Sequence, residues 1–113
     1  MRRVIVESPY SAPTPEGIAE NETYARRCLA DCLKRGEAPI ASHLLLTQPG
    51  VLNDADPAER FLGMRAGWAW TRVADAVVVY MDRGESRGMK QGVEWAHQIE
   101  VPVEFRYLDG EPG

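Results

Sequence analysis

The sequence predicts an α/β domain built on a short parallel sheet, and three observations support this class. Short apolar stretches alternate along the chain with longer segments whose apolar residues recur at helical spacing. The run 76–81 is apolar without alternation, as in a strand that helices cover on both faces. The 113 residues suffice for a single core. We therefore expect one domain over residues 1–108 and a flexible tail at 109–113.

Four strands are expected, each followed by a helical or irregular segment, and their connections predict the topology. The strands are placed at 4–6, 39–41, 76–81 and 101–105. Right-handed crossovers then predict the order 2-1-3-4, a flavodoxin-like or Rossmann-like three-layer sandwich with helices on both faces. In such sheets ligands bind at the carboxyl ends of the strands, near the point where the strand order reverses.

Capping signals and apolar spacing locate three helices between these strands. The first is expected to follow Asn21 as its cap and to end near Gly36, and the second begins with the helix-start signature at 56–59. The third runs over 87–97. The packed face of the second helix is predicted to hold Phe61, Met64, Trp68 and Thr71.

Charge and composition argue against several classes of partner. The net charge is -4 and the Lys and Arg residues are scattered, which argues against binding to a nucleic-acid polymer. No apolar run reaches the length of a membrane span, and the first residues lack the long apolar region of a signal peptide. We therefore expect a cytoplasmic protein that does not bind membranes.

The cysteine and tryptophan residues are interpreted as structural. Cys28 and Cys32 are four residues apart in a helical pattern, and no nearby His or Cys completes a tetrahedral site. They are expected to be reduced core thiols, and no metal site is predicted. Trp68, Trp70 and Trp95 are interpreted as core or subunit-interface residues, which favours a homodimer or larger homo-oligomer.

Polar residues that follow several strands are expected to meet at one edge of the sheet. The turn 82–89 leads into the third helix with Ser86 as its cap, and the free N–H groups that follow would attract an anion such as a phosphate or carboxylate. The candidate catalytic residues are Glu7, His43 and Asp82. The candidate ligand-binding residues are Ser8, Tyr10, Ser42, Ser86, Arg87, Gly88 and Met89.

Each of these residues also has a structural interpretation. Asp82 is equally well placed to form a turn beside Gly84, and Glu7 to pair with an arginine at the rim of the sheet. His43 is either a ligand contact, a solvated loop residue or a hydrogen-bonded core histidine. The turn at Ser86 is either an anion cradle or an ordinary helix cap.

Three segments together resemble the nucleoside 2-deoxyribosyltransferase-like superfamily, which includes deoxynucleoside monophosphate N-glycosidases and small bacterial and phage proteins. These segments are 5–10, 74–82 and 86–96, and the resemblance covers almost the whole chain. It implies a flavodoxin-like fold, a site for a small nucleoside or nucleotide and cleavage of the N-glycosidic bond without a cofactor. It also implies that Asp82 assists the base or sugar and that Ser86 and Gly88 form the phosphate turn.

The chain departs from this superfamily at the position of the nucleophile. The superfamily's nucleophilic glutamate lies four residues after the turn glycine, and that position is Gly92. Glu94 is two residues further along the helix, and it is rotated by about 200° around the axis. The carboxylate must therefore come from Glu7 or Asp82, either as a nucleophile or as a base that activates water, while His43 or the other carboxylate serves the leaving base.

Two functions follow from these observations. The first is an N-glycosidase or deoxyribosyltransferase-like activity on a small (deoxy)nucleoside or its monophosphate, which the presence of Glu7, His43 and Asp82 favours. The alternative is a catalytically silent nucleotide-binding protein that acts as a sensor or sink for a nucleotide signal, which Gly92 favours. A purely structural module would not need these converging polar groups.

Overall fold

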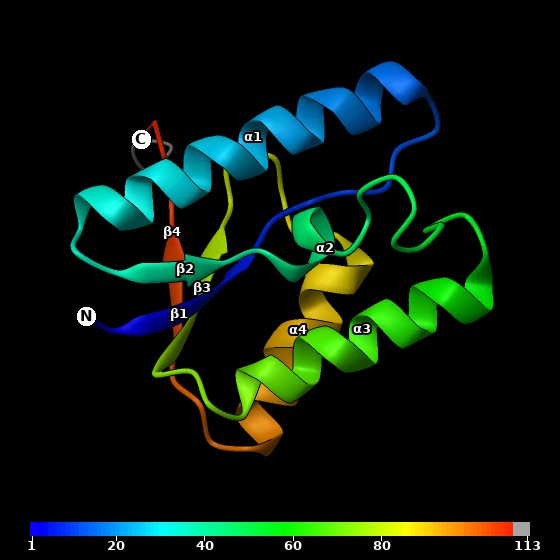
Figure 1. The fold of residues 1–113 in the computed structure, drawn as a ribbon. Helices are drawn as coiled ribbons and strands as arrows, with labels where there is room; N and C mark the ends of the chain where they lie inside the picture. The colour runs from blue at the N-terminus through cyan, green and yellow to red at the C-terminus, as the bar shows by residue number, and fades with distance from the viewer. Residues whose placement is uncertain (110–113) are drawn as a thin grey trace.

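A computed structural model describes residues 1–109 of the chain (Figure 1). Its strands form one parallel sheet of order β2-β1-β3-β4, which confirms the predicted α/β class and topology. Residues 110–113 of the expected tail lie outside the described residues, whereas Asp109 is described. The elements in chain order are β1 (Arg3–Glu7), α1 (Pro15–Lys34), β2 (Ala38–Ile40), α2 (Ser42–Leu45), α3 (Pro57–Thr71), β3 (Ala76–Tyr80), α4 (Arg87–Gln98) and β4 (Val103–Arg106).

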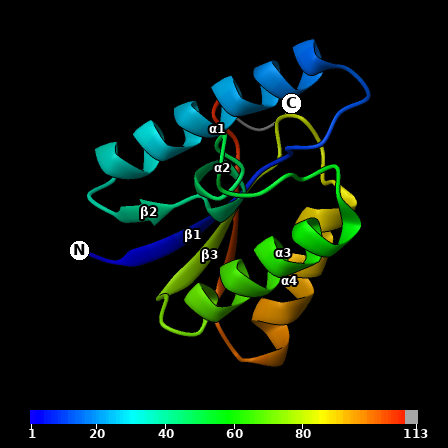
Figure 2. The same ribbon diagram turned by 45° about the vertical axis from the view of Figure 1, so that its right-hand side comes forward.

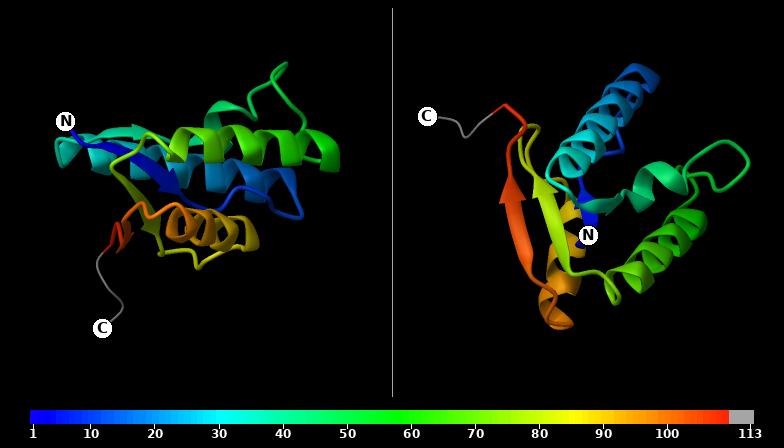
Figure 3. Two further views of the ribbon diagram at one scale, coloured as in Figure 1. Left: turned by 90° about the horizontal axis from the view of Figure 1, so that it is seen from below. Right: turned by 60° about the vertical axis from the view of Figure 1, so that its left-hand side comes forward.

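The helices cover the sheet from both sides. Helix α1 lies on one face, while α3 and α4 lie on the other (Figure 2). The short helix α2 contacts α3, and the segment 46–56 between them projects from the body of the molecule as a loop (Figure 3). The arrangement leaves the carboxyl ends of β1 and β2 facing α2, α3 and the beginning of α4.

Strand pleating determines which face each side chain reaches. Successive side chains of a strand point to opposite faces. In β1, Val4 and Val6 join the apolar cluster under α1, and Ile5 joins the cluster under α4. Glu7 follows Ile5 by two positions and pairs in register with Val79, which also lies in the α4 cluster. The last residue of β1 therefore directs a carboxyl group toward α4.

The first helix begins earlier than the sequence predicted. Thr14 is its N-cap, and the side chain accepts a hydrogen bond from the N–H of Gly17 at 3.1 Å, with Pro15 at the first helical position. The prediction of Asn21 as the cap is wrong: this residue is buried within the helix and donates to the carbonyl of Tyr10. The predicted end is confirmed, because Gly36 adopts a φ of 78° just after the helix.

The predicted starts of the other two long helices are confirmed. Asp56 caps α3 by accepting hydrogen bonds from the N–H groups of Ala58 and Glu59. Ser86 caps α4 and accepts from the N–H of Met89. The strand bounds and the end of α4 lie within two residues of the predicted ones, whereas the short helix α2 was not predicted.

The predicted packed face of α3 needs a correction. Phe61 is 55% exposed, and the residues that the helix buries are Gly67 and Thr71. A Cβ atom on Gly67 would lie 2.6 Å from the Oγ of Ser42, so the glycine lets α3 approach α2 closely. Thr71 is buried as predicted, and Met64 and Trp68 are half-buried, so the spacing misplaced only Phe61.

The cysteines and two of the tryptophans take the expected structural positions. Cys28 and Cys32 are free thiols buried in the α1 cluster. Trp68 and Trp95 stack with ring centroids 5.8 Å apart, where α3 meets α4. Trp70 is 53% exposed on α3. Across the part of the chain that the structure describes, no helix has the length and apolar character needed to cross a membrane.

Candidate functional site

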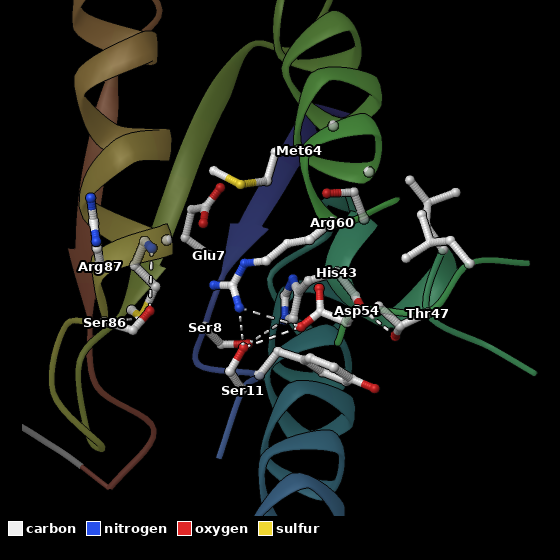
Figure 4. A pocket seen from close by; sticks show the side chains of 18 of the residues that line it. Glu7, Ser8, Ser11, His43, Thr47, Asp54, Arg60, Met64, Ser86 and Arg87 are labelled. Atoms are coloured by element: carbon white, nitrogen blue, oxygen red, sulfur yellow. Dashed lines mark hydrogen bonds and ion pairs between the residues drawn. The ribbon is translucent and has the colours of Figure 1, made fainter. Parts of the chain in front are cut away.

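A cavity of about 270 Å³ opens at the carboxyl ends of β1 and β2, between α2, α3 and the start of α4 (Figure 4). Every predicted site residue except Asp82 lines it. Polar and apolar side chains share the wall, as in sites for small organic ligands. The predicted residues in the wall are Glu7, Ser8, Tyr10, Ser42, His43, Ser86, Arg87, Gly88 and Met89.

Glu7 lies deep in this cavity, and its carboxyl group is isolated. Among residues 1–109 it has no hydrogen-bond or ion-pair partner, so the alternative of a rim carboxylate paired with an arginine does not describe it. Its burial raises the pKa of the carboxyl group to about 8. The Glu7 side chain is half-buried and lines the cavity, and a carboxyl group that is partly removed from water without a partner is characteristic of residues retained for a site.

Gly92 provides the space that the Glu7 carboxyl group occupies. A Cβ atom on Gly92 would lie 2.5 Å from Oε2 and 2.7 Å from Cδ of Glu7. Real Cβ atoms do not approach other atoms so closely, so no other residue fits at position 92 while Glu7 keeps its place. The carboxyl group from β1 thus fills the volume that a side chain from α4 would otherwise use.

A serine–histidine pair lies beside Glu7. The Oγ of Ser8 and the Nε2 of His43 are hydrogen-bonded at 2.8 Å, and the ring of Tyr10 meets the His43 ring edge-on at 6.4 Å between centroids. Burial lowers the pKa of His43 to about 4, against the opposing effect of the Asp54 carboxylate. The imidazole is therefore neutral at pH 7 and exchanges hydrogen bonds without carrying charge.

The beginning of α4 forms another part of the wall. Ser86 closes the helix end through two contacts: its Oγ accepts from the N–H of Met89, and its own N–H points to the Met89 sulfur at 3.3 Å. The first N–H groups of a helix have no partner within the helix. Ser86 thus leaves the N–H groups of Arg87 and Gly88 free to meet a ligand anion.

Several wall residues were not predicted from the sequence as site residues, and three of them form a connected polar cluster. Arg60, from α3, donates to the Oγ of Ser11 at 2.8 Å and lies 3.6 Å from the carboxylate of Asp54. Ser11 in turn donates to Asp54 at 3.2 Å. Asp54 lies in the loop between α2 and α3. An arginine in the second turn of a helix gives no local signal of function, because this residue is common on solvated helix faces.

Asp82 is placed away from the cavity. Its carboxylate accepts hydrogen bonds from the hydroxyl of Tyr24 at 2.6 Å and from the N–H groups of Leu108 and Asp109 at 2.9 and 3.1 Å. Burial alone would raise its pKa, but these donors outweigh that effect and lower it. Asp82 ties β3 to α1 and to the chain after β4, so it carries no step in the function proposed below.

The described residues offer no candidate metal centre. Within residues 1–109, no group of three or more His, Cys, Asp and Glu side chains is arranged to hold a metal ion.

The fold and the cavity first define a general class of protein. This is a parallel α/β sandwich with a small-molecule cavity at the carboxyl ends of its strands. Residues 2–106 match one family model, so the chain belongs to the family described as Domain of unknown function (DUF7768).

A comparison with solved structures adds the fold relationship. The chain is similar to a 2-deoxyribosyltransferase from the psychrotolerant bacterium Bacillus psychrosaccharolyticus, with a TM-score of 0.65 and 16% identity. The match covers 98% of this chain and 76% of that enzyme. At this identity the similarity shows a shared fold. A comparison with curated protein sequences finds no match.

Proposed function

We propose that this protein cleaves or transfers the N-glycosidic bond of a small nucleoside or its monophosphate, with Glu7 as the reacting carboxylate. The observation that carries this proposal is the isolated Glu7 carboxyl group in the cavity, in the space that Gly92 leaves open. The shared fold with a 2-deoxyribosyltransferase supports the choice of substrate class.

The proposed reaction proceeds in two balanced steps. An oxygen of ionised Glu7 attacks the anomeric carbon, and the bond to the base nitrogen breaks with its electron pair on the base. The departing base takes a proton from solvent. In the second step water attacks the anomeric carbon, and the ester bond to Glu7 breaks with its electrons returning to the carboxylate. The proton that water loses goes to solvent and balances the proton that the base took from solvent. A second base in place of water gives transfer.

The serine–histidine pair is proposed to position the sugar or base. Because His43 is neutral, Ser8 and His43 can each donate or accept a hydrogen bond according to the imidazole tautomer. A ligand hydroxyl or amine can complete this pair without introducing an unpaired charge. His43 is accordingly a positioning residue, since a group with a pKa of about 4 holds no proton to donate from an imidazolium at neutral pH.

A second candidate function is ligand binding without chemistry, and one observation favours it. With a pKa of about 8, Glu7 keeps its proton in most molecules at pH 7. A protonated carboxyl group donates a hydrogen bond to a base or a sugar oxygen instead of attacking carbon. The two candidates therefore differ in the dependence on pH: turnover by ionised Glu7 rises toward pH 8, whereas binding to the protonated form weakens there.

The proposal is tested by incubating the protein with ribo- and deoxyribonucleosides and their monophosphates and measuring free base by chromatography. Wild type is expected to release base from at least one of them, and Glu7→Gln to be slower by about 1,000-fold. Glu94→Gln is the matched control. This glutamate is exposed on the same helix as Gly92, outside the cavity wall, and its substitution leaves the rate unchanged.

Two outcomes would contradict the proposed chemistry. Base release that persists in Glu7→Gln would remove Glu7 from the reaction. Stabilisation of the protein by a nucleotide in a thermal-shift assay, with no release of base at any pH from 6 to 9, would support the binding function instead.

A further inference from the structure

Among the described residues that line the cavity, Arg60 is the one cationic residue that α3 contributes. Its guanidinium uses one nitrogen, Nη1, for both Ser11 and Asp54. The contact with Asp54, at 3.6 Å, is an ion pair without a direct hydrogen bond. Figure 4 shows the guanidinium extended across the cavity, between the Ser8 and Ser11 side and Glu7.

The other guanidinium nitrogen faces the beginning of α4. The Nη2 of Arg60 would be 4.0 Å from a Cβ atom on Gly88, and no other side chain from outside this turn of α4 lies within that distance. The free N–H groups at Arg87 and Gly88 lie on this helix end. Donors from two separate elements, α3 and α4, thus border the same part of the cavity. Glu7 lines the same cavity, and its half-buried carboxyl group has no partner among residues 1–109, which also favours a ligand there.

The charges of the wall favour an anionic ligand. Arg60 and Arg87 are positive and Asp54 is negative, while Glu7 keeps its proton in most molecules at neutral pH. The wall is therefore positive in a chain whose net charge is -4. A local positive potential in an acidic protein attracts anions to one place and repels them elsewhere.

We propose that Arg60 selects ligands that carry a phosphate monoester, and that the phosphate replaces Asp54 as the partner of its guanidinium. This proposal rests on the proposed function and narrows it to nucleoside monophosphates. A tethered carboxylate competes at an effective concentration on the order of millimolar. A single carboxylate on a ligand cannot displace it efficiently, whereas a phosphate monoester carries a charge of about -1.5 to -2 and can pair with both terminal guanidinium nitrogens, Nη1 and Nη2.

If phosphate replaces Asp54, substitutions of Arg60 and of Asp54 should change the affinity for phosphate in opposite directions. Removing Arg60 takes away a ligand for the phosphate, and removing the charge of Asp54 takes away the competitor. A pair that only stabilised the loop would behave differently, because loss of either partner would then weaken the site in the same way.

The test is isothermal titration of the full chain with inorganic phosphate, with a deoxynucleoside and with its 5′-monophosphate. Arg60→Gln is expected to weaken binding of phosphate and monophosphate by about 10- to 100-fold and to leave nucleoside binding unchanged. Asp54→Asn is expected to strengthen phosphate binding by about three- to tenfold. Arg65→Gln, an exposed arginine of α3 outside the cavity wall, is the matched control and leaves all three affinities unchanged.

Three results would overturn this inference. In the first, wild type does not bind phosphate at about 10 mM, which is on the order of the effective concentration of the competing carboxylate. In the second, Arg60→Gln binds phosphate as tightly as wild type does. In the third, both Arg60→Gln and Asp54→Asn bind phosphate more weakly than wild type. Arg60→Lys guards against misfolding, since it keeps the charge and is expected to lose only part of the affinity. Binding needs no turnover, so absence of base release with Arg60-dependent phosphate binding would overturn the proposed chemistry and leave this inference standing.

Discussion

Glu7 and Asp82 follow neighbouring strands of the same sheet, yet their surroundings are opposite. Glu7 ends β1 on the α4 side, has no partner among the described residues and has a pKa raised to about 8. Asp82 follows β3 on the α1 side, accepts hydrogen bonds from Tyr24, Leu108 and Asp109, and has a lowered pKa. A satisfied carboxylate stabilises the fold, whereas an isolated one is available to a ligand.

The largest effect that separates the two acids is expected in the pH dependence of stability. The pKa of Glu7 is about 8 in the folded chain and near 4.5 when unfolded, so the folded state holds a proton that the unfolded state loses above pH 4.5. Stability therefore falls as pH rises toward 8. Glu7→Gln removes this loss, and its gain over wild type should grow from near zero at pH 4 to about 4–5 kcal/mol at pH 8.5.

Urea unfolding at a series of pH values measures this gain. Glu94→Gln serves as the control, because this exposed residue should give a constant difference across the range. A gain for Glu7→Gln that does not change with pH would mean that the Glu7 carboxyl group ionises with its ordinary pKa.

The contact between Glu7 and Gly92 provides the next test. Replacing a helical glycine with alanine normally stabilises a helix by about 1 kcal/mol. Here the added Cβ would meet the Glu7 carboxyl group at 2.5 Å. The carboxyl group is the far end of a flexible side chain and can rotate aside, so Gly92→Ala is expected to lose this gain and to cost up to about 1 kcal/mol. The variant is also expected to displace Glu7 and slow base release.

A double-mutant cycle identifies the cause of that loss. In the Glu7→Ala background, Gly92→Ala should recover the ordinary stabilising effect of alanine in a helix. If Gly92→Ala destabilises both backgrounds equally, the crowding at position 92 comes from other atoms and the pairing of these two residues is wrong.

The smallest effect is expected at Asp82. Asp82→Asn replaces one acceptor oxygen with a donor that opposes the N–H of Asp109, so it should lower stability at pH 7 by about 1 kcal/mol. Because the pKa of Asp82 is lowered in the folded state, the stabilisation it gives is present above its unfolded pKa and is lost as the pH falls.

Base release should differ from wild type by less than about twofold in this variant, since Asp82 lies outside the cavity wall. Urea unfolding at pH 7 and at pH 3, together with the chromatographic assay, checks both statements. A large loss of base release at unchanged stability would show that Asp82 takes part in the reaction.

The fold was predictable because its signals are local. Apolar runs mark the strands, Asp56 and Ser86 mark helix starts, and right-handed crossovers then leave one strand order. The start of α1 was misplaced because both Thr14 and Asn21 have side chains suited to a cap, and only the buried position of Asn21 distinguishes them.

The site was predictable in its location and less so in its details. The rule that ligands bind at strand ends brought most of the candidate residues to one cavity. The rule does not say which face of the sheet a side chain at a strand end reaches. Asp82 and Glu7 differ in this respect, because Glu7 lies on the α4 side and Asp82 on the α1 side. Nor does the rule reveal Arg60 and Asp54, since their pairing depends on how the loop between α2 and α3 packs.

The measurement that tests the account most directly is a carbon-13 NMR titration of the Asp and Glu carboxyl groups, with Glu7→Gln and Asp82→Asn used to assign the two signals. The expected midpoint for Glu7 is near pH 8 and moves when a deoxynucleoside monophosphate is added, while the expected midpoint for Asp82 lies below the ordinary Asp value. A Glu7 midpoint near 4.5 that ignores the nucleotide would contradict the claim that this carboxyl group is isolated and faces the ligand.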